Sequence, residues 1–345
     1  MREKKNIRLL KLEDVVSFCS SNNRPKFRAK QIWEWLWTKR ATSFNDMTSL
    51  PISFRLLLND NFVINPIKIH KIIKSLDGTI KYSFKLYDNH LIEGVLIPSK
   101  NRLTACISSQ VGCSLSCKFC ATGTLKLKRN INAAEIYDQV FLLNNEAIQK
   151  FHKPISNIVY MGMGEPLLNY NSVISSINFI TSKEGLAMSP KRITVSTAGI
   201  AKMIKKLADD KIKFNLAISL HSANDVIRNG LMPINEKIDL FELTESIKYF
   251  YEKTNIRVTY EYILFKNIND SLEDAKQLLK YAKNTPCKIN LIEYNTVESL
   301  PYSKSSSKST NRFIEYLEDN NIIVNLRRSK GKDIAAACGQ LVNKF

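Results

Sequence analysis

From residue 104 onward the chain alternates between short apolar runs and longer amphipathic segments, and this alternation restricts the possible folds more than any other feature. Apolar runs of strand length lie at 104–108, 157–161, 192–196, 215–220, 257–264, 288–292 and 322–326. Segments with helical periodicity lie between them, at 133–147, 171–181, 200–208, 240–252, 272–283 and 311–318. This pattern predicts a parallel sheet with right-handed crossovers, either an open doubly wound sheet or a full or partial barrel.

The part of the chain before residue 104 has a different pattern. Residues 25–62 read as helices, and residues 67–109 contain short apolar runs separated by Asp77-Gly78 and Asp88-Asn89, which are typical hairpin turns. We therefore expect three parts: a helical domain at 1–65, a β extension at 66–102 and a large α/β domain at 103–345. The polar stretch 301–310 is predicted to be a loop.

Composition narrows the class of protein. A chain of 345 residues, 44% of them hydrophobic, suits one large domain with a small one, and we expect a monomer. No apolar run reaches the roughly 18–20 residues of a membrane span, and the charged N-terminus has no signal-peptide pattern, so we expect a cytoplasmic protein. The net charge of +19 favours a nucleic-acid partner. The alternative explanation of the charge is an AT-rich genome, which raises the lysine content without selection for binding. Lysines outnumber arginines 37 to 14, as such a genome would produce.

The seven cysteines indicate metal or redox chemistry, since an odd number in a chain without an export signal argues against a disulfide scaffold. Cys113, Cys117 and Cys120 have the spacing C-x3-C-x2-C. Three such thiolates can hold three irons of a [4Fe–4S] cluster and leave the fourth iron open, as a catalytic cluster requires. The alternatives are a zinc knuckle or buried free thiols.

Polar or reactive residues follow the predicted strands at their carboxyl ends, where functional residues gather in parallel β/α folds. The three cysteines follow the first of these strands; later strands are followed, in chain order, by Gly164, Glu165, Ser196, Ser219, Leu220, His221, Asn295 and Cys338. Glycine allows the backbone to approach a ligand closely. Taken alone, His221 reads as a structural residue, but the shared edge of the sheet predicts one binding site.

Three further residues carry chemical hypotheses. Cys338 lies near Lys330, Lys332 and Arg328 at a predicted strand-to-helix turn, which predicts a lowered thiol pKa and a nucleophile; the alternative is a small buried residue. Glu93 is a carboxylate in an apolar strand, where burial would suit it to proton transfer, although an exposed position is equally consistent with the sequence. Cys106 reads as a buried strand residue.

Together these motifs resemble the radical S-adenosylmethionine (radical-SAM) RNA adenosine C2-methyltransferases of the RlmN type. The matching stretches are 27–33, 93–98, 106–113, 162–170, 216–221, 231–235 and 336–341, and the last of these, with its cysteine, is highly specific to the family. The resemblance implies a partial (β/α)6-type radical-SAM barrel with a small N-terminal helical domain that binds RNA. It implies a [4Fe–4S] cluster on the three cysteines and two SAM molecules per turnover. The implied SAM-binding residues are Gly164, Glu165, Ser196, Ser219, Leu220, His221 and Asn295.

The resemblance also implies a reaction. A methyl group carried by Cys338 would reach C2 of one adenosine in 23S rRNA, and of the adenosine 3′ of the anticodon in certain tRNAs, through a covalent RNA adduct. Glu93 would take the C2 proton, and Cys106 would attack the Cys338 sulfur, releasing the product and leaving a disulfide. The electron donor would be a protein such as flavodoxin or ferredoxin.

Two alternatives to C2 methylation are kept. The related Cfr type modifies C8 of the same ribosomal adenosine, but residues 166–170 and Glu93 resemble the C2 enzymes more closely. A non-catalytic Fe–S protein that binds RNA would need the cluster and the positive charge, but it would not need Cys338.

Overall fold

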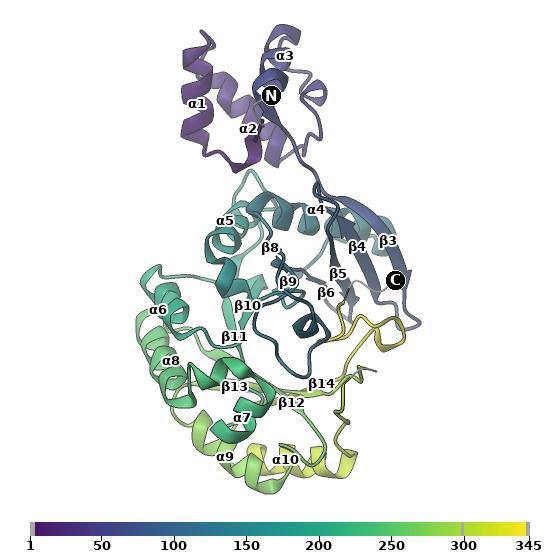
Figure 1. The fold of residues 1–345 in the computed structure, drawn as a ribbon, viewed down its shortest axis with the longest axis vertical. Coiled ribbons are helices and arrows are strands. Elements are labelled where there is room, and N and C mark those ends of the chain that lie inside the picture. The colour runs from purple at the N-terminus through teal and green to yellow at the C-terminus, as the bar shows by residue number, and fades with distance from the viewer. Residues whose placement is uncertain (1–3, 298–299, 343–345) are drawn as a thin grey trace.

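The structure, a computed structural model, describes residues 4–297 and 300–342, and its centre is a ten-stranded sheet (Figure 1). Seven strands pair in parallel: β6 (Leu103–Cys106), β9 (Asn157–Tyr160), β10 (Ile193–Thr197), β11 (Asn215–Ser219), β12 (Val258–Leu264), β13 (Cys287–Glu293) and β14 (Val324–Arg327). In the described part of the chain the strand order runs from β14 at one edge through β6 to β3 at the other, so the sheet is open. The seven predicted strands are confirmed, as is the partial barrel.

The other three strands extend the sheet beyond β6 as an antiparallel meander of β3 (Lys68–Lys74), β4 (Ile80–Lys85) and β5 (Leu91–Pro98). Both predicted hairpin turns are confirmed. Gly78 has a φ of +85° between β3 and β4, and Asn89 has a φ of +65° between β4 and β5. These are the residue types that adopt the left-handed region at low cost.

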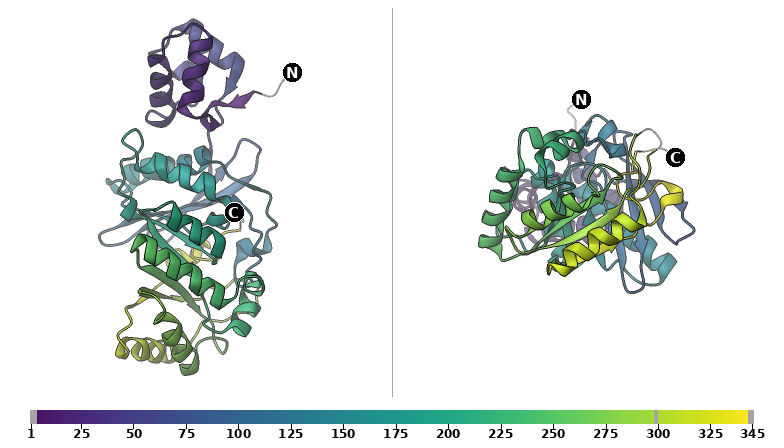
Figure 2. Two further views of the ribbon diagram at one scale, coloured as in Figure 1. Left: turned by 90° about the vertical axis from the view of Figure 1, so that its left-hand side faces the viewer. Right: turned by 90° about the horizontal axis from the view of Figure 1, so that it is seen from below.

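Seven helices follow the strands of the barrel within the described residues, and Figure 2 shows them lining the outer face of the curved sheet. They are α4 (Ala133–Phe151), α5 (Tyr170–Thr181), α6 (Ala201–Asp209), α7 (Asp225–Leu231), α8 (Leu240–Thr254), α9 (Leu272–Ala282) and α10 (Ser307–Asp319). The sequence did not predict α7. The loop predicted at 301–310 is wrong over its last four residues, because the Ser306 hydroxyl accepts from the Ser309 amide at 3.0 Å and caps α10.

The shorter elements connect these layers. They are β1 (Lys5–Asn6), β2 (Phe62–Val63), β7 (Gln110–Val111) and β8 (Arg129–Asn130), with 3-10 turns η1 (Ile7–Leu9), η2 (Phe44–Asp46), η3 (Ala121–Thr124), η4 (Pro166–Asn169), η5 (Pro190–Arg192), η6 (Pro233–Glu236) and η7 (Lys332–Ile334).

The N-terminal helices α1 (Leu12–Ser21), α2 (Phe27–Trp37) and α3 (Ile52–Asn61) form a separate lobe at the top of Figure 1. The lobe contacts the barrel through α4 and α5. The Trp37 ring stacks on Phe179 with centroids 3.6 Å apart, and Arg8 and Arg40 reach the buried Asp138 carboxylate at 2.8 and 3.0 Å. Because a buried carboxylate needs such partners, these contacts fix the lobe on the barrel.

Residues 328–342 follow β14, which lies at one edge of the sheet. They cross to the β3–β5 meander at the opposite edge (Figure 1). The Gly331 amide donates to Asp77 at 2.9 Å, and the Val342 amide donates to Glu93 at 2.9 Å. We call residues 328–342 the C-terminal segment. It spans the open side of the barrel and brings Val342 against β5.

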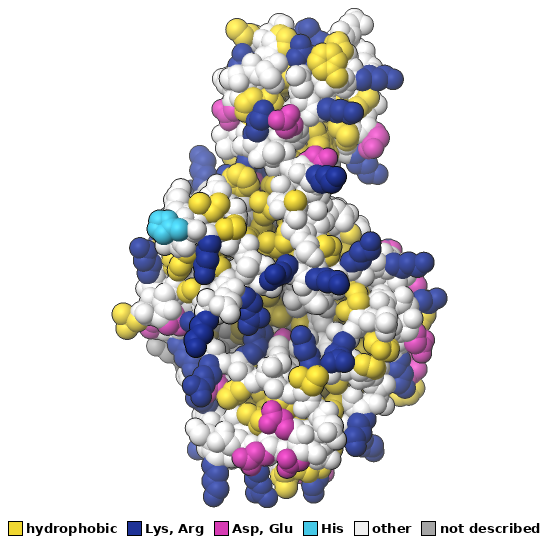
Figure 3. All heavy atoms as spheres, turned by 180° about the vertical axis from the view of Figure 1, so that it is seen from behind, with side chains coloured by type: hydrophobic (Ala, Val, Ile, Leu, Met, Phe, Trp, Pro, Cys, Tyr) yellow, Lys and Arg dark blue, Asp and Glu magenta, His cyan; other side chains and the backbone are white. Residues whose placement is uncertain are grey.

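Lys and Arg side chains are distributed over the whole face shown in Figure 3, on the N-terminal lobe as well as on the barrel. On that face the positive charge is not gathered into one patch, so charge by itself does not locate a binding surface there. No helix in the described ranges has the length and apolar character needed to cross a membrane.

Candidate active site

The three closely spaced cysteines lie on the loop that follows β6. Cys113, Cys117 and Cys120 all line one cavity at the carboxyl ends of the parallel strands. The loop needs glycine at its start, because Gly112 has a φ of +78° and an added Cβ would lie 2.3 Å from the Lys126 carbonyl oxygen. The spacing seen in the sequence therefore places three thiols around one space.

Burial is the main influence on these thiols. It raises the pKa of Cys113 to about 11, and it also raises the pKa values of Cys117 and Cys120. The thiols of Cys120 and Cys113 raise the pKa of Cys117 further, because like charges on neighbouring groups oppose one another. A bound cation centre would offset this cost.

The donor set fits a [4Fe–4S] cluster. Within the residues that the structure describes, no group of three His, Cys, Asp or Glu side chains could hold a metal ion. A [4Fe–4S] cluster makes a different demand, since each thiolate binds a different iron. Three cysteines on one loop, with the cavity on their open side, meet that demand and leave one iron accessible.

The turn after β9 forms the adjoining wall of the cavity. Gly164 has a φ of +95°, and an added Cβ would lie 2.4 Å from the Gln110 side chain. The Glu165 carboxylate accepts from the amides of Ala198 and Leu167 at 2.8 and 3.0 Å, and burial raises its pKa to about 7. Glu165 thus ties the β9 turn to the end of β10 and places a carboxyl group at the cavity wall.

Replacing Gly164 with alanine is expected to lower the free energy of unfolding by about 1–3 kcal/mol, because the positive φ and the contact with Gln110 both oppose a side chain. Gly230 in α7 is the matched control, because an added Cβ there has nothing within 4 Å. Gly230→Ala is expected to be neutral or to stabilise by up to about 1 kcal/mol. Chemical denaturation of both cofactor-free variants measures the difference, and equal effects would contradict the steric argument.

Strands β10 and β11 supply the polar residues opposite the cysteine loop. Ser196, Ser219 and His221 line the cavity. The His221 Nδ1 accepts from the Ile263 amide at 3.1 Å, and burial lowers the pKa of the imidazole to about 3. His221 is therefore neutral, with its proton on Nε2 as a hydrogen-bond donor.

Two of the predicted binding residues lie outside the cavity lining. The Leu220 side chain is fully buried in the core, and its carbonyl oxygen accepts from Arg228 at 3.1 Å. Asn295 is buried beside the cavity, and its Nδ2 donates to the Cys338 carbonyl oxygen at 3.3 Å. The Asn295 Oδ1 has no hydrogen-bond partner among the described residues, which leaves a buried acceptor for a ligand.

Cys338 lies on the C-terminal segment and lines the same cavity as the three loop cysteines. The predicted lowering of its pKa is wrong. Cys338 is an exposed residue that lines the cavity, but desolvation raises the pKa of its thiol, and Arg327 acts against this rise as a nearby cation. Lys332, which was expected to assist, instead pairs with Glu293 at 3.1 Å. The predicted helix is also absent among the described residues here, since Lys332–Ile334 form only a 3-10 turn.

Cys106 on β6 is buried, and the Cys338 thiol lies close enough to affect its pKa. Burial, followed by the nearby Cys338 thiol, raises the pKa of Cys106 to about 12. Arg327 lowers the pKa of both thiols, and its guanidinium lies 3.1 Å from Glu261. Sequence analysis missed Arg327 and Glu261. The available signal was Glu261, the one charged residue inside β12, because a carboxylate in a buried strand rarely lacks a partner.

Glu93 on β5 is fully buried and does not line the cavity. Its side chain shares a sheet face with Cys106, because Cys106 pairs with Val95 and side chains alternate along β5. The carboxylate accepts from the Val342 amide at 2.9 Å and lies 3.4 Å from the Lys81 ammonium group. The alternative of an exposed Glu93 is therefore excluded.

A partial β/α barrel with a three-cysteine loop and a Gly-Glu turn at the carboxyl ends of its strands defines a radical-SAM enzyme. The family model of the radical SAM superfamily matches residues 107–281. The family model of the ribosomal RNA large subunit methyltransferase N-terminal domain matches residues 5–64.

Relatives match over nearly the whole chain. A probable dual-specificity RNA methyltransferase RlmN of Christiangramia forsetii is 54% identical over 341 residues, covering 99% of this chain and 97% of the relative. The dual-specificity RNA methyltransferase RlmN of Geotalea uraniireducens is 39% identical over 343 residues, covering 99% and 98%. The crystal structure of a radical SAM methyltransferase from Sphaerobacter thermophilus superposes with a TM-score of 0.91 at 36% identity, covering 98% and 99%.

The chain therefore belongs to the RlmN family of dual-specificity RNA methyltransferases, and the resemblance seen in the sequence is confirmed. It is an enzyme that methylates RNA. Membership of the radical-SAM superfamily implies a [4Fe–4S] cluster and SAM as its cofactors.

Proposed function

We propose that the protein methylates C2 of one adenosine in 23S rRNA and of the adenosine 3′ of the anticodon in certain tRNAs. The observation that carries this proposal is the position of Cys338. It comes from the far end of the chain, yet it lines the same cavity as the cysteine loop. A thiol beside the expected radical source suits a carrier for the methyl group, and a protein that only binds RNA has no use for one.

The cavity residues divide into two sets in this proposal. Cys113, Cys117 and Cys120 would hold the cluster. The SAM-binding set would be the side chains or backbone of Gly164, Glu165, Ser196, Ser219, Leu220, His221 and Asn295. The unpartnered Asn295 Oδ1 and the fixed Glu165 carboxyl support this assignment. When bound, the cluster would donate one electron and accept one back after the carbon–carbon bond forms, and two molecules of SAM per turnover would supply the methyl group and the hydrogen-abstracting radical.

The chain's own residues would do the rest of the chemistry. C2 of adenine is not nucleophilic, so the Cys338 sulfur would carry the methyl carbon and join that carbon to C2. Glu93 would take the C2 proton. The Cys106 thiolate would then attack the Cys338 sulfur, the S–C bond would break with its electron pair left on carbon, and that carbon would take a proton to become the methyl group. The Cys106–Cys338 disulfide formed in this step would be reduced by an external thiol.

The remaining parts of the proposal concern partners and location. Residues 1–65 would bind RNA, and residues 66–102 would connect them to the catalytic domain at 103–345. The net charge of +19 suits an RNA substrate. We further propose a monomer in the cytoplasm that receives electrons from a donor such as flavodoxin or ferredoxin.

Mass spectrometry of nucleosides from 23S rRNA and tRNA tests the target. The RNA is taken from a strain lacking the gene and from the same strain with the gene restored. We expect 2-methyladenosine in both RNA classes only when the gene is present. Finding 8-methyladenosine would assign the protein to the Cfr type, and unchanged RNA would favour a protein that binds RNA without modifying it.

A further inference from the structure

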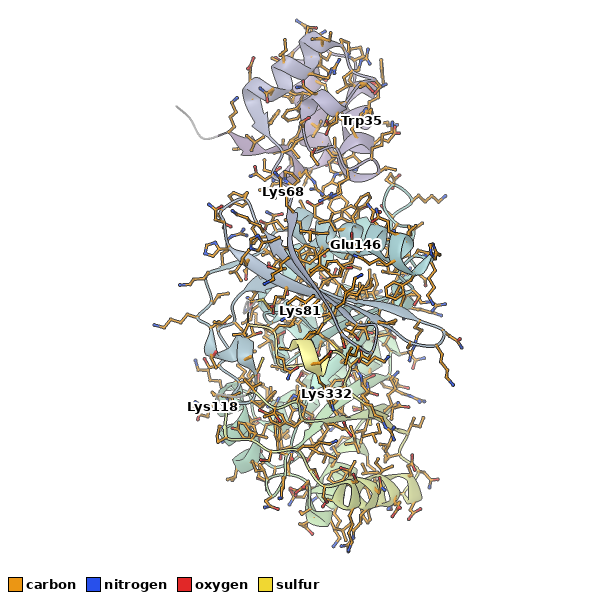
Figure 4. All side chains as sticks on the ribbon, turned by 90° about the vertical axis from the view of Figure 1, so that its right-hand side faces the viewer. Trp35, Lys68, Lys81, Lys118, Glu146 and Lys332 are labelled. Carbon is orange, nitrogen blue, oxygen red and sulfur yellow. The ribbon has the colours of Figure 1, made fainter. Side chains whose placement is uncertain are left out.

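A buried ion pair lies inside the barrel beside the proposed reaction site. Lys81 on β4 and Glu93 on β5 point to the same face of the sheet, with their charged groups 3.4 Å apart and side-chain exposures of 3% and 0%. Figure 4 shows the labelled Lys81 on the meander beside the C-terminal segment. A lysine is rarely buried to this extent, so its position calls for a reason.

Both members of the pair contact the segment that carries Cys338. The Lys81 ammonium group donates to the Ala335 carbonyl oxygen at 3.4 Å, and the Glu93 carboxylate accepts from the Val342 amide at 2.9 Å. The two contacts lie on either side of Cys338 in the sequence. The pair therefore links the proposed base to the segment that would carry the methyl group.

The proposed base is covered in this arrangement. Glu93 is fully buried, and the Val342 amide occupies one of its oxygens. A proton on an RNA base in the cavity cannot reach this carboxylate until the end of the C-terminal segment moves.

We propose that Lys81 is a positioning residue that holds Glu93 as a carboxylate on the inner face of the sheet, and that it remains the partner of Glu93 when RNA displaces the Val342 amide. This inference rests on the proposed role of Glu93 as the base. The physical reason is that burial favours the neutral form of a carboxyl group, and a neighbouring cation favours the ionised form. Only the ionised form can take a proton.

Infrared difference spectroscopy of the cofactor-free protein at neutral pH tests the first half of the proposal. Subtracting the Glu93→Gln spectrum from the wild-type spectrum isolates the signal of Glu93. In the wild type we expect no C=O band of a protonated carboxyl group. In Lys81→Met we expect such a band, which is isolated by subtracting the spectrum of Lys81→Met/Glu93→Gln. Lys81→Arg keeps the charge and should show no band. If Lys81→Met does not fold, Lys81→Gln replaces it.

A protonated band in the wild type, or its absence in the neutral Lys81 variants, would overturn the proposal. The measurement needs no cluster, SAM or RNA. It therefore gives its answer whether or not the protein proves to methylate C2, and failure of the proposed function is distinguishable from failure of this inference.

Single-turnover methylation tests the second half. Glu93→Gln is expected to slow product formation by about 10²-fold or more, as for loss of a general base. The rate of Lys81→Met should be close to that of Glu93→Gln, and the rate of Lys81→Arg should be close to that of the wild type. If Lys81 acts through Glu93, adding Lys81→Met to Glu93→Gln causes little further loss, whereas independent effects would multiply. Lys276→Met is the control, since Lys276 pairs with Glu273 on the exposed side of α9. Multiplying effects in the double variant would overturn the proposal.

Discussion

Replacing Cys338 with alanine is expected to abolish 2-methyladenosine formation while leaving the cluster in place. Cys338 is the one cysteine of the C-terminal segment, and it lines the cavity together with the cysteines of the loop. If its sulfur carries the methyl group, no other described side chain in the cavity can replace it without giving up a cluster ligand. Nucleoside mass spectrometry of RNA from a deletion strain expressing the variant gives the result.

Two measurements separate this outcome from a folding defect. The iron content of the purified variant is expected to match the wild type, because Cys338 is not among the proposed ligands. Cys287→Ala is the matched control, since Cys287 lies on β13, donates to the Ala282 carbonyl oxygen at 3.4 Å and does not line the cavity. We expect the control to keep its activity. Product from Cys338→Ala would show that the mechanism is wrong.

The sequence was sufficient to predict the barrel, because strand and helix periodicity are local properties. The predicted strand at 257–264 is β12, Val258–Leu264, and all seven of its residues are buried. A strand covered on both faces lacks a polar face, and the β-branched and aromatic residues of this short segment favour a strand over a helix. Short helices were harder. α7 has seven residues, too few to show a clear period.

The gathering of the site at one sheet edge was also predictable. Parallel strands present their carboxyl ends together, so residues following different strands meet whatever their separation in the sequence. This rule placed Ser196, Ser219 and His221 in the cavity with the cysteine loop. The rule could not distinguish a side chain that lines the cavity from a buried one. For this reason the predicted set included Leu220, whose side chain lies in the core.

The path of the C-terminal segment could not be predicted from local pattern. It is fixed by contacts between residues about 250 positions apart, such as Gly331 with Asp77 and Val342 with Glu93. These contacts decide the environment of Cys338. The nearby lysines suggested a lowered thiol pKa, yet the segment carries the thiol into the barrel, where desolvation raises the pKa and Arg327 opposes the rise. A cation close in sequence does not establish a cation close to the sulfur.

Replacing Cys106 with alanine is expected to trap a covalent complex between protein and RNA. Cys106 is buried on β6, the nearby Cys338 thiol raises the pKa of Cys106, and Arg327 lowers the pKa of both thiols. In the proposed reaction Cys106 is the thiol that attacks the Cys338 sulfur, so without it the bond between Cys338 and the RNA base cannot be broken. A denaturing gel should show a band that shifts back on digestion with ribonuclease.

The double variant Cys106→Ala/Cys338→Ala is the decisive control, because it removes the proposed attachment point. We expect it to form no adduct, and mass spectrometry of the digested single variant should place the nucleotide on Cys338. Undiminished turnover by Cys106→Ala would remove this thiol from the mechanism. An adduct in the double variant would move the attachment to another residue. Loss of product without any adduct would mean that Cys106 acts before the carbon–carbon bond forms, for example by shaping the buried face that it shares with Glu93.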